Sequence, residues 1–283
     1  FLLGLCGERG VQVSFLTEHG RFLARVSGAV SGNVLLRREQ VRRADNPAAS
    51  LAIARSFVLG KLANSRTVMQ RALRDHGPDA ALETAVNTLA NAIRRAGEAD
   101  DIDILRGIEG EAANAYFGAF DSMIVAQKEC FHMTGRSRRP PLDPLNALLS
   151  FLYTLLAHDC TAALEGVGLD PQMGFLHALR PGRPSLALDL MEEFRSVLAD
   201  RVALSLINLK QINARSFTTS ESGAVVMKDD DRKNVLKAWQ QKKQETLQYP
   251  FLEQKIEIGL LPHAQALLLA RHATLAVGDL GLD

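Results

Sequence analysis

The sequence predicts a mainly α protein with a small N-terminal β piece, an α+β arrangement. Apolar residues recur at helical spacing over most of the chain. Asn46-Pro47 and Asp143-Pro144 each place a capping side chain directly before proline at the first helical position. Hairpin signals are confined to one stretch near the N-terminus and one in the C-terminal third. Together these patterns indicate a short β segment followed by a large helical domain.

The N-terminal β piece is predicted from residues 11–26. Residues 11–16 (V-Q-V-S-F-L) alternate in polarity, 17–20 (T-E-H-G) form a turn, and 21–26 (R-F-L-A-R-V) return. The chain begins at Phe1 without methionine, inside a helical pattern. We therefore expect residues 1–30 to be the remnant of a truncated N-terminal β domain.

Residues 31–283 are expected to form a helical catalytic domain with a hairpin insertion near 216–227, around Ser220-E-S-G. The expected helices are separated by glycine and proline breaks such as Gly77-Pro78. They span about 46–75, a stretch ending near 95, the Glu109 segment, a helix from 144, and about 184–212, 230–247 and 262–272.

Composition limits the class of protein only broadly. With 47% apolar and 23% charged residues, 283 residues can bury an ordinary core, and the net charge of +1 does not by itself indicate a nucleic-acid binder. Cys6, Cys130 and Cys160 include no CxxC pair, so they fit small buried side chains in a reducing cytosol. No apolar run reaches bilayer length and no signal pattern is visible, which favours a cytoplasmic protein.

The segment 174–195 holds the strongest candidate site. His177 lies in a glycine- and proline-broken loop, and Asp189 and Glu192 follow three residues apart on one helix face. An imidazole with carboxylates is a ligand set for a divalent metal used in phosphoryl chemistry. A solvated acidic face and a structural histidine are the alternatives to a metal site.

A second candidate acid lies in the segment 105–117. From Glu109 the i+3, i+4 and i+7 positions are apolar and end at Tyr116, whereas those from Glu111 suit water. A carboxylate on a packed face needs a cation or a donor, so Glu109 is the better ligand candidate. A salt bridge from Glu109 to a neighbour such as Arg106 is the alternative.

Several polar and basic side chains are candidate phosphate contacts. The helix from Pro144 carries a polar row opposite its leucines, which either lines a cleft or faces solvent: Asn146, Ser150 and Tyr153. Irregular loops carry the arginines Arg136, Arg138, Arg139, Arg180 and Arg183, which either contact DNA or are simply solvated.

In these residues the chain resembles the CRISPR-associated adaptation endonucleases and integrases, the Cas-one family. The matching motifs are L-R-G-I-E-G (105–110), A-N-A-Y-F (113–117), P-L-D-P-L-N-A-L-L-S-F-L-Y (141–153), G-F-L-H (174–177) and P-S-L-A-L-D-L-M-E-E-F-R (184–195). The likeness extends over nearly the whole chain. The loop after His177 and the hairpin near Ser216 resemble the type I-C branch.

The resemblance implies Glu109, His177 and Glu192 as ligands of Mg²⁺ or Mn²⁺, with Asp189 an adjacent acid needed for activity. It implies insertion of foreign DNA fragments into a CRISPR repeat array by transesterification, in which a fragment 3′-hydroxyl attacks a repeat phosphodiester. The implied partners are double-stranded DNA, a second copy of the chain, a Cas-two dimer and, in some type I systems, Cas-four. A stand-alone endonuclease on branched DNA and a non-catalytic DNA-binding scaffold are the competing functions.

Overall fold

The computed structural model describes residues 1–9, 11, 13–16, 22–26, 34–133, 135–137, 140–249 and 253–275. In this part of the chain helices dominate and the strands form three separate two-stranded sheets, which confirms the predicted fold class. In chain order the helices are α1 (Leu2–Glu8), α2 (Val34–Asp45), α3 (Pro47–His76), α4 (Ala80–Glu98), α5 (Ile102–Gly118), α6 (Pro144–Gly166), α7 (Ser185–Phe194), α8 (Arg201–Asn208), α9 (Asp229–Gln244) and α10 (Leu261–Leu275). Short 3₁₀ turns at Phe120–Met123, Ala214–Ser216 and Ile258–Leu260 connect some of them.

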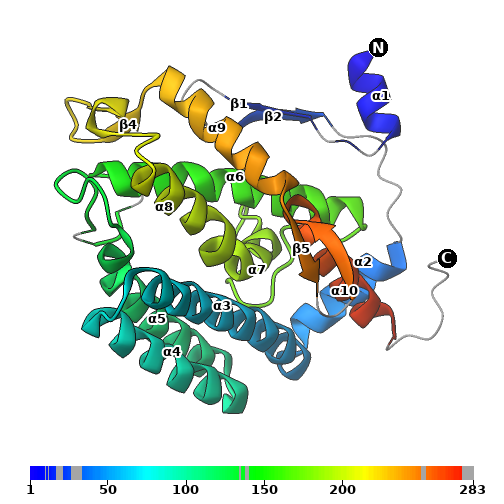
Figure 1. The fold of residues 1–283 in the computed structure, drawn as a ribbon. Coiled ribbons are helices and arrows are strands. Elements are labelled where there is room, and N and C mark those ends of the chain that lie inside the picture. The colour runs from blue at the N-terminus through cyan, green and yellow to red at the C-terminus, as the bar shows by residue number, and fades with distance from the viewer. Residues whose placement is uncertain are drawn as a thin grey trace.

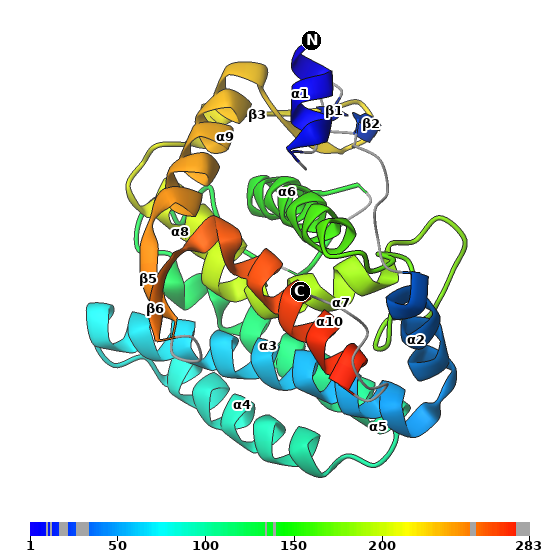
Figure 2. The ribbon, with the colours of Figure 1, turned by 90° about the vertical axis from the view of Figure 1, so that its right-hand side faces the viewer.

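The helical body is built around two long helices. Helix α3 packs against α4, α5 and α7, while α6 packs against α7 and α10 (Figure 1). The short helix α7 therefore lies between the two, in contact with both. Turning the molecule brings α10 to the front, where it packs against α6, α7 and α2 (Figure 2).

The start of α3 follows its local sequence. The Asn46 side chain accepts a hydrogen bond from the N–H of Ala49 at 3.0 Å, and Pro47 occupies the first turn. The helix stops at Gly77, whose φ of 92° is in the region that favours glycine. The predicted break at Gly77-Pro78 is thus confirmed.

Helix α6 is more buried than a one-sided amphipathic helix. Asp143 caps it by accepting from the N–H of Asn146 at 2.7 Å, as the Asp143-Pro144 signal predicts. By length and composition α6 alone, among the helices of the described segments, qualifies as a candidate membrane span, so the expectation that no apolar run is long enough is wrong. Its apolar window is 61% buried inside the protein, as in the core helix of a folded domain.

The predicted single helix over 184–212 is interrupted. A π-helical segment, Arg195–Asp200, separates α7 from α8. Such wide turns add a residue to the helical repeat and shift the side chains that follow to another face. The helix then ends at Asn208, and Lys210 beyond it adopts a positive φ of 55°.

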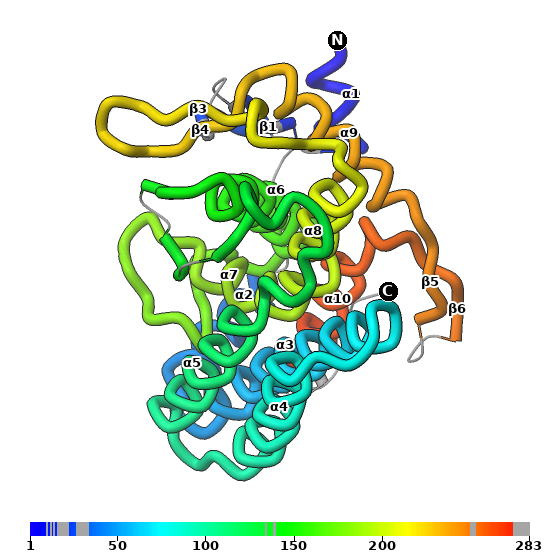
Figure 3. Tube along the Cα trace, turned by 60° about the vertical axis from the view of Figure 1, so that its left-hand side comes forward, coloured from blue at the N-terminus to red at the C-terminus, as the bar shows by residue number. Residues whose placement is uncertain are grey.

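The hairpins match the sequence patterns in two cases of three. Strands β1 (Val13–Leu16) and β2 (Phe22–Val26) pair antiparallel with an irregularity between Phe15 and Leu16, and β3 (Phe217–Thr219) pairs with β4 (Val225–Met227). Both predicted hairpins are therefore confirmed, and Figure 3 shows them at one end of the molecule. The pair β5 (Thr246–Tyr249) and β6 (Gln254–Glu257) was missed, because the helix predicted to 247 ends at Gln244.

Candidate active site

Three elements meet at a pocket of about 280 Å³. Helix α5 contributes Glu109, the loop before α7 contributes His177, and α7 contributes Glu192. Arg106, Leu176 and Ala178 complete its lining. The structure thus brings together the three residues that the resemblance implies as metal ligands.

Glu109 projects from the packed face of α5, where Ala112 and Tyr116 are buried below it. Its carboxylate forms an ion pair with the ammonium group of Lys61 on α3. The alternative partner, Arg106, instead donates to the backbone oxygen of Leu176 from Nε at 2.9 Å and Nη2 at 2.6 Å. The alternative of a salt bridge at Glu109 is therefore found, with Lys61 as its partner in place of Arg106.

Glu111 faces the other side of α5, as its spacing predicts. It is paired with Arg95 at 2.7 Å, and its side chain is 52% exposed. This acid lies outside the pocket lining and provides a matched control for Glu109.

Asp189 is fully buried and holds the His177 loop in place. Its Oδ2 accepts the N–H groups of Phe175 at 2.7 Å and Leu176 at 3.0 Å. Its Oδ1 accepts the N–H of His177 at 2.9 Å and contacts that residue's ring Nδ1 at 2.7 Å. Nδ1 is thereby occupied, which leaves Nε2 of His177 as the ring nitrogen free for a ligand. With 0% exposure at Asp189, a solvated acidic face is wrong.

Gly174 lets the loop approach this carboxylate. A Cβ atom at position 174 would lie 2.7 Å from the backbone carbonyl carbon of Ser185 and 2.8 Å from Oδ2 of Asp189. Both distances are shorter than carbon atoms tolerate, so the close packing of the loop on α7 needs glycine here.

Glu192 is equally enclosed, with a side chain 7% exposed. Lys61 Nζ lies 2.6 Å from its Oε2, and Arg195 Nη1 donates to both carboxylate oxygens at 2.8 Å and 3.0 Å. Burial opposes ionisation, but Arg195 and Lys61 outweigh it and hold the pKa of Glu192 well below its usual range. Glu192 is therefore ionised and available as an anionic ligand.

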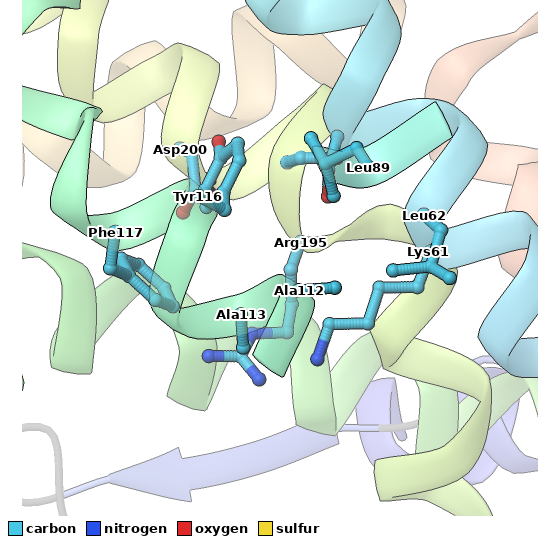
Figure 4. A pocket seen from close by; sticks show the side chains of 11 residues that line it. Lys61, Leu62, Leu89, Ala112, Ala113, Tyr116, Phe117, Arg195 and Asp200 are labelled. Atoms are coloured by element: carbon cyan, nitrogen blue, oxygen red, sulfur yellow. Dashed lines mark hydrogen bonds between the residues drawn. The ribbon is translucent and has the colours of Figure 1, made fainter. Parts of the chain in front are cut away.

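Arg195 packs against a buried network of Tyr153, Tyr116 and Asp200. Its guanidinium lies 4.4 Å from the ring centroid of Tyr153, and Figure 4 shows it extending beside Lys61. Asp200 accepts the hydroxyl hydrogen bonds of Tyr153 at 2.6 Å and Tyr116 at 2.9 Å. Burial, together with the neighbouring carboxylate of Asp200, raises the pKa of both tyrosines, so both hydroxyls remain donors.

The polar row on α6 lies inside the protein. Asn146 is 0% exposed, accepts from Arg136 and donates to the backbone oxygen of Gly135 at 2.8 Å and to Asp143 at 2.6 Å. Tyr153 is also buried. Both expectations for this row, cleft-lining and solvent-facing, are wrong for these two residues.

The remaining phosphate candidates divide by position. Ser150 is half-buried, and its hydroxyl oxygen has no hydrogen-bond partner among the residues that the structure describes. Arg136 lies over the rings of Phe117 at 5.4 Å and Tyr153 at 5.2 Å, which is a packing role. Arg138 and Arg139 lie outside the described residues.

Arg180 and Arg183 lie on the same loop as His177, directly after the pocket-lining Ala178. The Arg180 side chain is exposed, and Arg183 is partly exposed. Gly182 has a φ of 73° in the tight turn between them. Of the predicted phosphate contacts, this pair lies on the loop that lines the pocket.

In the segments that the structure describes, no three histidine, cysteine or acidic side chains form a ready metal cluster. Lys61 lies between Glu109 and Glu192 instead. The chemistry of the donors still fits a divalent ion, because two carboxylates and a free imidazole Nε2 face one pocket. Lys61 was not predicted from the sequence. The sequence pattern that could have indicated it is a lysine among the apolar residues on the buried side of α3, where Lys61 is 8% exposed.

Residues 1–241 match the model of the family described as CRISPR associated protein Cas1. The chain belongs to the Cas1 family. It is 57% identical over 276 residues to the "CRISPR-associated endonuclease Cas1 1" of Chlorobaculum tepidum, covering 96% of this chain and 80% of that protein. It is 53% identical over 278 residues to "CRISPR-associated endonuclease Cas1 2" of Rhodospirillum rubrum, with 96% and 80% covered. The type I-C branch stays a prediction.

Solved structures of Cas1 proteins share the fold. The Cas1 protein TM1797 from Thermotoga maritima matches with a TM-score of 0.80 over 98% of this chain and 82% of that one, at 24% identity. A casposase bound to integration product matches with a TM-score of 0.84 over 98% and 76%, also at 24% identity. At this identity the likeness supports the helical architecture and nothing finer.

Proposed function

We propose that this protein is a metal-dependent DNA endonuclease and integrase that inserts foreign DNA fragments into a CRISPR repeat array by transesterification. The observation that carries the proposal is the convergence of Glu109, His177 and Glu192, from three separate elements, on one pocket. The close Cas1 relatives named as endonucleases support the nuclease part of this function.

Glu109, Glu192 and Nε2 of His177 would hold the ion, and Mn²⁺ or Mg²⁺ suits this mixed oxygen and nitrogen set. A divalent ion held there would supply polarisation of phosphoryl oxygens and stabilisation of charge on the attacking and leaving oxygens. Asp189 contributes by orientation, since all four of its hydrogen bonds go to the His177 loop. We therefore assign it a positioning role.

The substrate in this proposal is double-stranded DNA, both protospacer and repeat. Arg180 and Arg183 would neutralise phosphates at the pocket rim. In the reaction the fragment 3′-hydroxyl loses its proton as its oxygen bonds to the repeat phosphorus. The bond between that phosphorus and the repeat's own oxygen breaks, and this oxygen takes up a proton and leaves as a hydroxyl. Because one phosphodiester replaces another, no covalent enzyme intermediate is needed.

The proposed partners are a second copy of the chain, a Cas-two dimer and Cas-four. Matches of the fold include a Cas6-RT-Cas1–Cas2 complex, with a TM-score of 0.79 over 96% of this chain and 29% of that one. A relative from Geobacter sulfurreducens, 36% identical over 271 residues, is a Cas4/Cas1 fusion. We place the protein in the cytoplasm, where such DNA is processed.

A non-catalytic scaffold with solvated acids is disfavoured, because Asp189 and Glu192 are 0% and 6% exposed. A stand-alone endonuclease on branched DNA would use the same pocket. The two activities are separated by mixing the chain with its small partner, a processed duplex and a repeat plasmid, and scoring integrated product against nicked product.

The test of the site compares Glu109→Ala with Glu111→Ala. Loss of the proposed ligand should lower strand transfer by at least about two orders of magnitude, since several kcal/mol of transition-state stabilisation depend on the ion. The Glu111 variant, which loses only an exposed pair with Arg95, should keep full activity. Normal strand transfer by Glu109→Ala would remove this residue from the site.

A further inference from the structure

Lys61 occupies the centre of the proposed metal site. Its ammonium group contacts Glu109 on one side and lies 2.6 Å from Glu192 on the other, joining α3 to both acid-bearing helices. The lysine side chain is 10% exposed, so water screens these contacts weakly. Together with Arg195, which pairs with Glu192, this ammonium group balances the charge of the two carboxylates in the protein without metal.

An ammonium group and a divalent ion cannot share these oxygens. A bound ion needs the carboxylate oxygens at about 2.0–2.6 Å, and the positive charge of Lys61 would then lie in direct repulsion with it. Lys61 must therefore leave at least one of its two partners when the metal binds.

A second place for the ammonium exists beside the first. A small cavity of about 10 Å³, close to the size of one water molecule, lies beside Lys61 (Figure 4). Its polar lining comes from Ser65, Tyr116, Arg195, Ser196 and Asp200, and leucine, alanine and phenylalanine side chains form the rest. The hydroxyl oxygen of Ser196 is buried there without a hydrogen-bond partner among the described residues. The residue is 2% exposed, and a buried hydroxyl without a hydrogen-bond partner is unusual.

We propose that Lys61 is a built-in counter-cation that competes with the divalent ion for Glu109 and Glu192. On metal binding its ammonium group moves into the adjacent cavity and donates to Ser196 near the Asp200 carboxylate. This inference rests on the proposed metal site and adds to it a residue that sets metal affinity. With Arg195, Lys61 keeps the metal-free site neutral, and its competition with the ion weakens metal binding.

The test is a Mn²⁺ titration of the metal-free protein, followed by the electron paramagnetic resonance signal of free Mn²⁺. Lys61→Met removes the competing charge while keeping the side-chain volume, so it should bind Mn²⁺ about tenfold more tightly or better. Lys61→Gln, which keeps a donor without the charge, should also bind more tightly, whereas Lys61→Arg should not. Mn²⁺ affinity in both neutral variants equal to or below that of the wild type would overturn the inference.

Ser196→Ala tests the second position. In the wild-type background it should weaken Mn²⁺ binding by about threefold or more, because Lys61 loses its new acceptor. In the Lys61→Met background it should change nothing, since no ammonium group remains to move. An equal effect in both backgrounds would show that Ser196 does not receive Lys61.

His177→Ala separates this inference from the proposed function. If the wild type binds Mn²⁺, His177→Ala weakens it, and the neutral Lys61 variants do not bind more tightly, then the metal site stands and the competing lysine falls. If neither the wild type nor His177→Ala binds Mn²⁺, both proposals fall together.

Discussion

Replacing Asp189 with asparagine should both destabilise the protein and misplace His177. Asparagine keeps one oxygen but turns the other into an NH₂ group. In the structure each carboxylate oxygen faces two hydrogen-bond contacts from the loop 175–177. The NH₂ group would therefore face groups that require an acceptor, whichever way the amide is turned.

The magnitude follows from the contacts that are lost. If the amide group replaces Oδ2, two buried backbone N–H groups lose their acceptor, at about 1–3 kcal/mol each. The expected loss in the free energy of unfolding is thus about 2–6 kcal/mol. If it replaces Oδ1 instead, the ring Nδ1 of His177 also loses its anionic partner, and Mn²⁺ affinity or strand-transfer rate should fall about 10- to 100-fold.

Urea unfolding by circular dichroism measures the first effect, and Mn²⁺ titration with strand transfer at saturating metal measures the second. Glu192→Gln is the comparison. Because Glu192 is a proposed ligand, Glu192→Gln should chiefly weaken metal affinity. Because Asp189 positions His177, Asp189→Asn should lower the strand-transfer rate even at saturating metal. An Asp189→Asn protein with wild-type stability, rate and metal affinity would refute this assignment.

Three further outcomes follow from the structure. Changing Arg180 and Arg183 together to glutamine should make the slope of log affinity for DNA against log salt concentration shallower by nearly 2, because the loss of two phosphate contacts means that fewer counterions are released on binding. An unchanged slope in binding titrations would mean that the loop is only solvated. Gly174→Ala should cost about 1–3 kcal/mol of stability, because the new Cβ overlaps Ser185 and Asp189, and a wild-type melting curve would contradict this. Burial raises the pKa of Glu193 from 4.5 to about 7, so its contribution to stability is complete below pH 4.5 and is lost as the pH rises through 7. The side chain in Glu193→Gln stays neutral, so the free energy of unfolding of this variant should exceed that of the wild type by up to about 3 kcal/mol at pH 8 and by little at pH 4. Equal free energies of unfolding at pH 8 would contradict the pKa shift.

Helix starts and the choice between neighbouring acids were predictable because they depend on residues close in sequence. Asn46 and Asp143 cap their helices as the capping-proline pairs predict. The apolar row from Glu109 correctly placed that acid on the packed face of α5, and Glu111 on the exposed one. Both inferences need only the helical repeat and the preference of carboxylates for water or cations.

Features that depend on several packed elements were not predictable. The polar row of α6 was expected to face a cleft or solvent, which assumes a helix with one open side. In the structure α6 contacts α7, α8, α10 and β4, so Asn146 and Tyr153 are enclosed by protein. The π-helical turn at Arg195–Asp200 likewise has no local signal. In the structure Arg195 lies over the ring of Tyr153, and Asp200 accepts a hydrogen bond from the hydroxyl of the same residue.

The charges around the pocket explain why the metal ion should displace Lys61 but leave Arg195 in place. Arg195 bonds both oxygens of Glu192 from the next turn of the same chain segment, and it is fixed by Tyr153 behind it. Glu109 has no such partner within α5, and its ion pair among the described residues is with Lys61. When Lys61 moves away, Glu192 thus keeps a compensating charge while Glu109 loses its own. The ion therefore gains most of its new attraction from Glu109. Removal of Lys61 should accordingly destabilise the metal-free protein mainly through the uncompensated charge of Glu109, and less through Glu192.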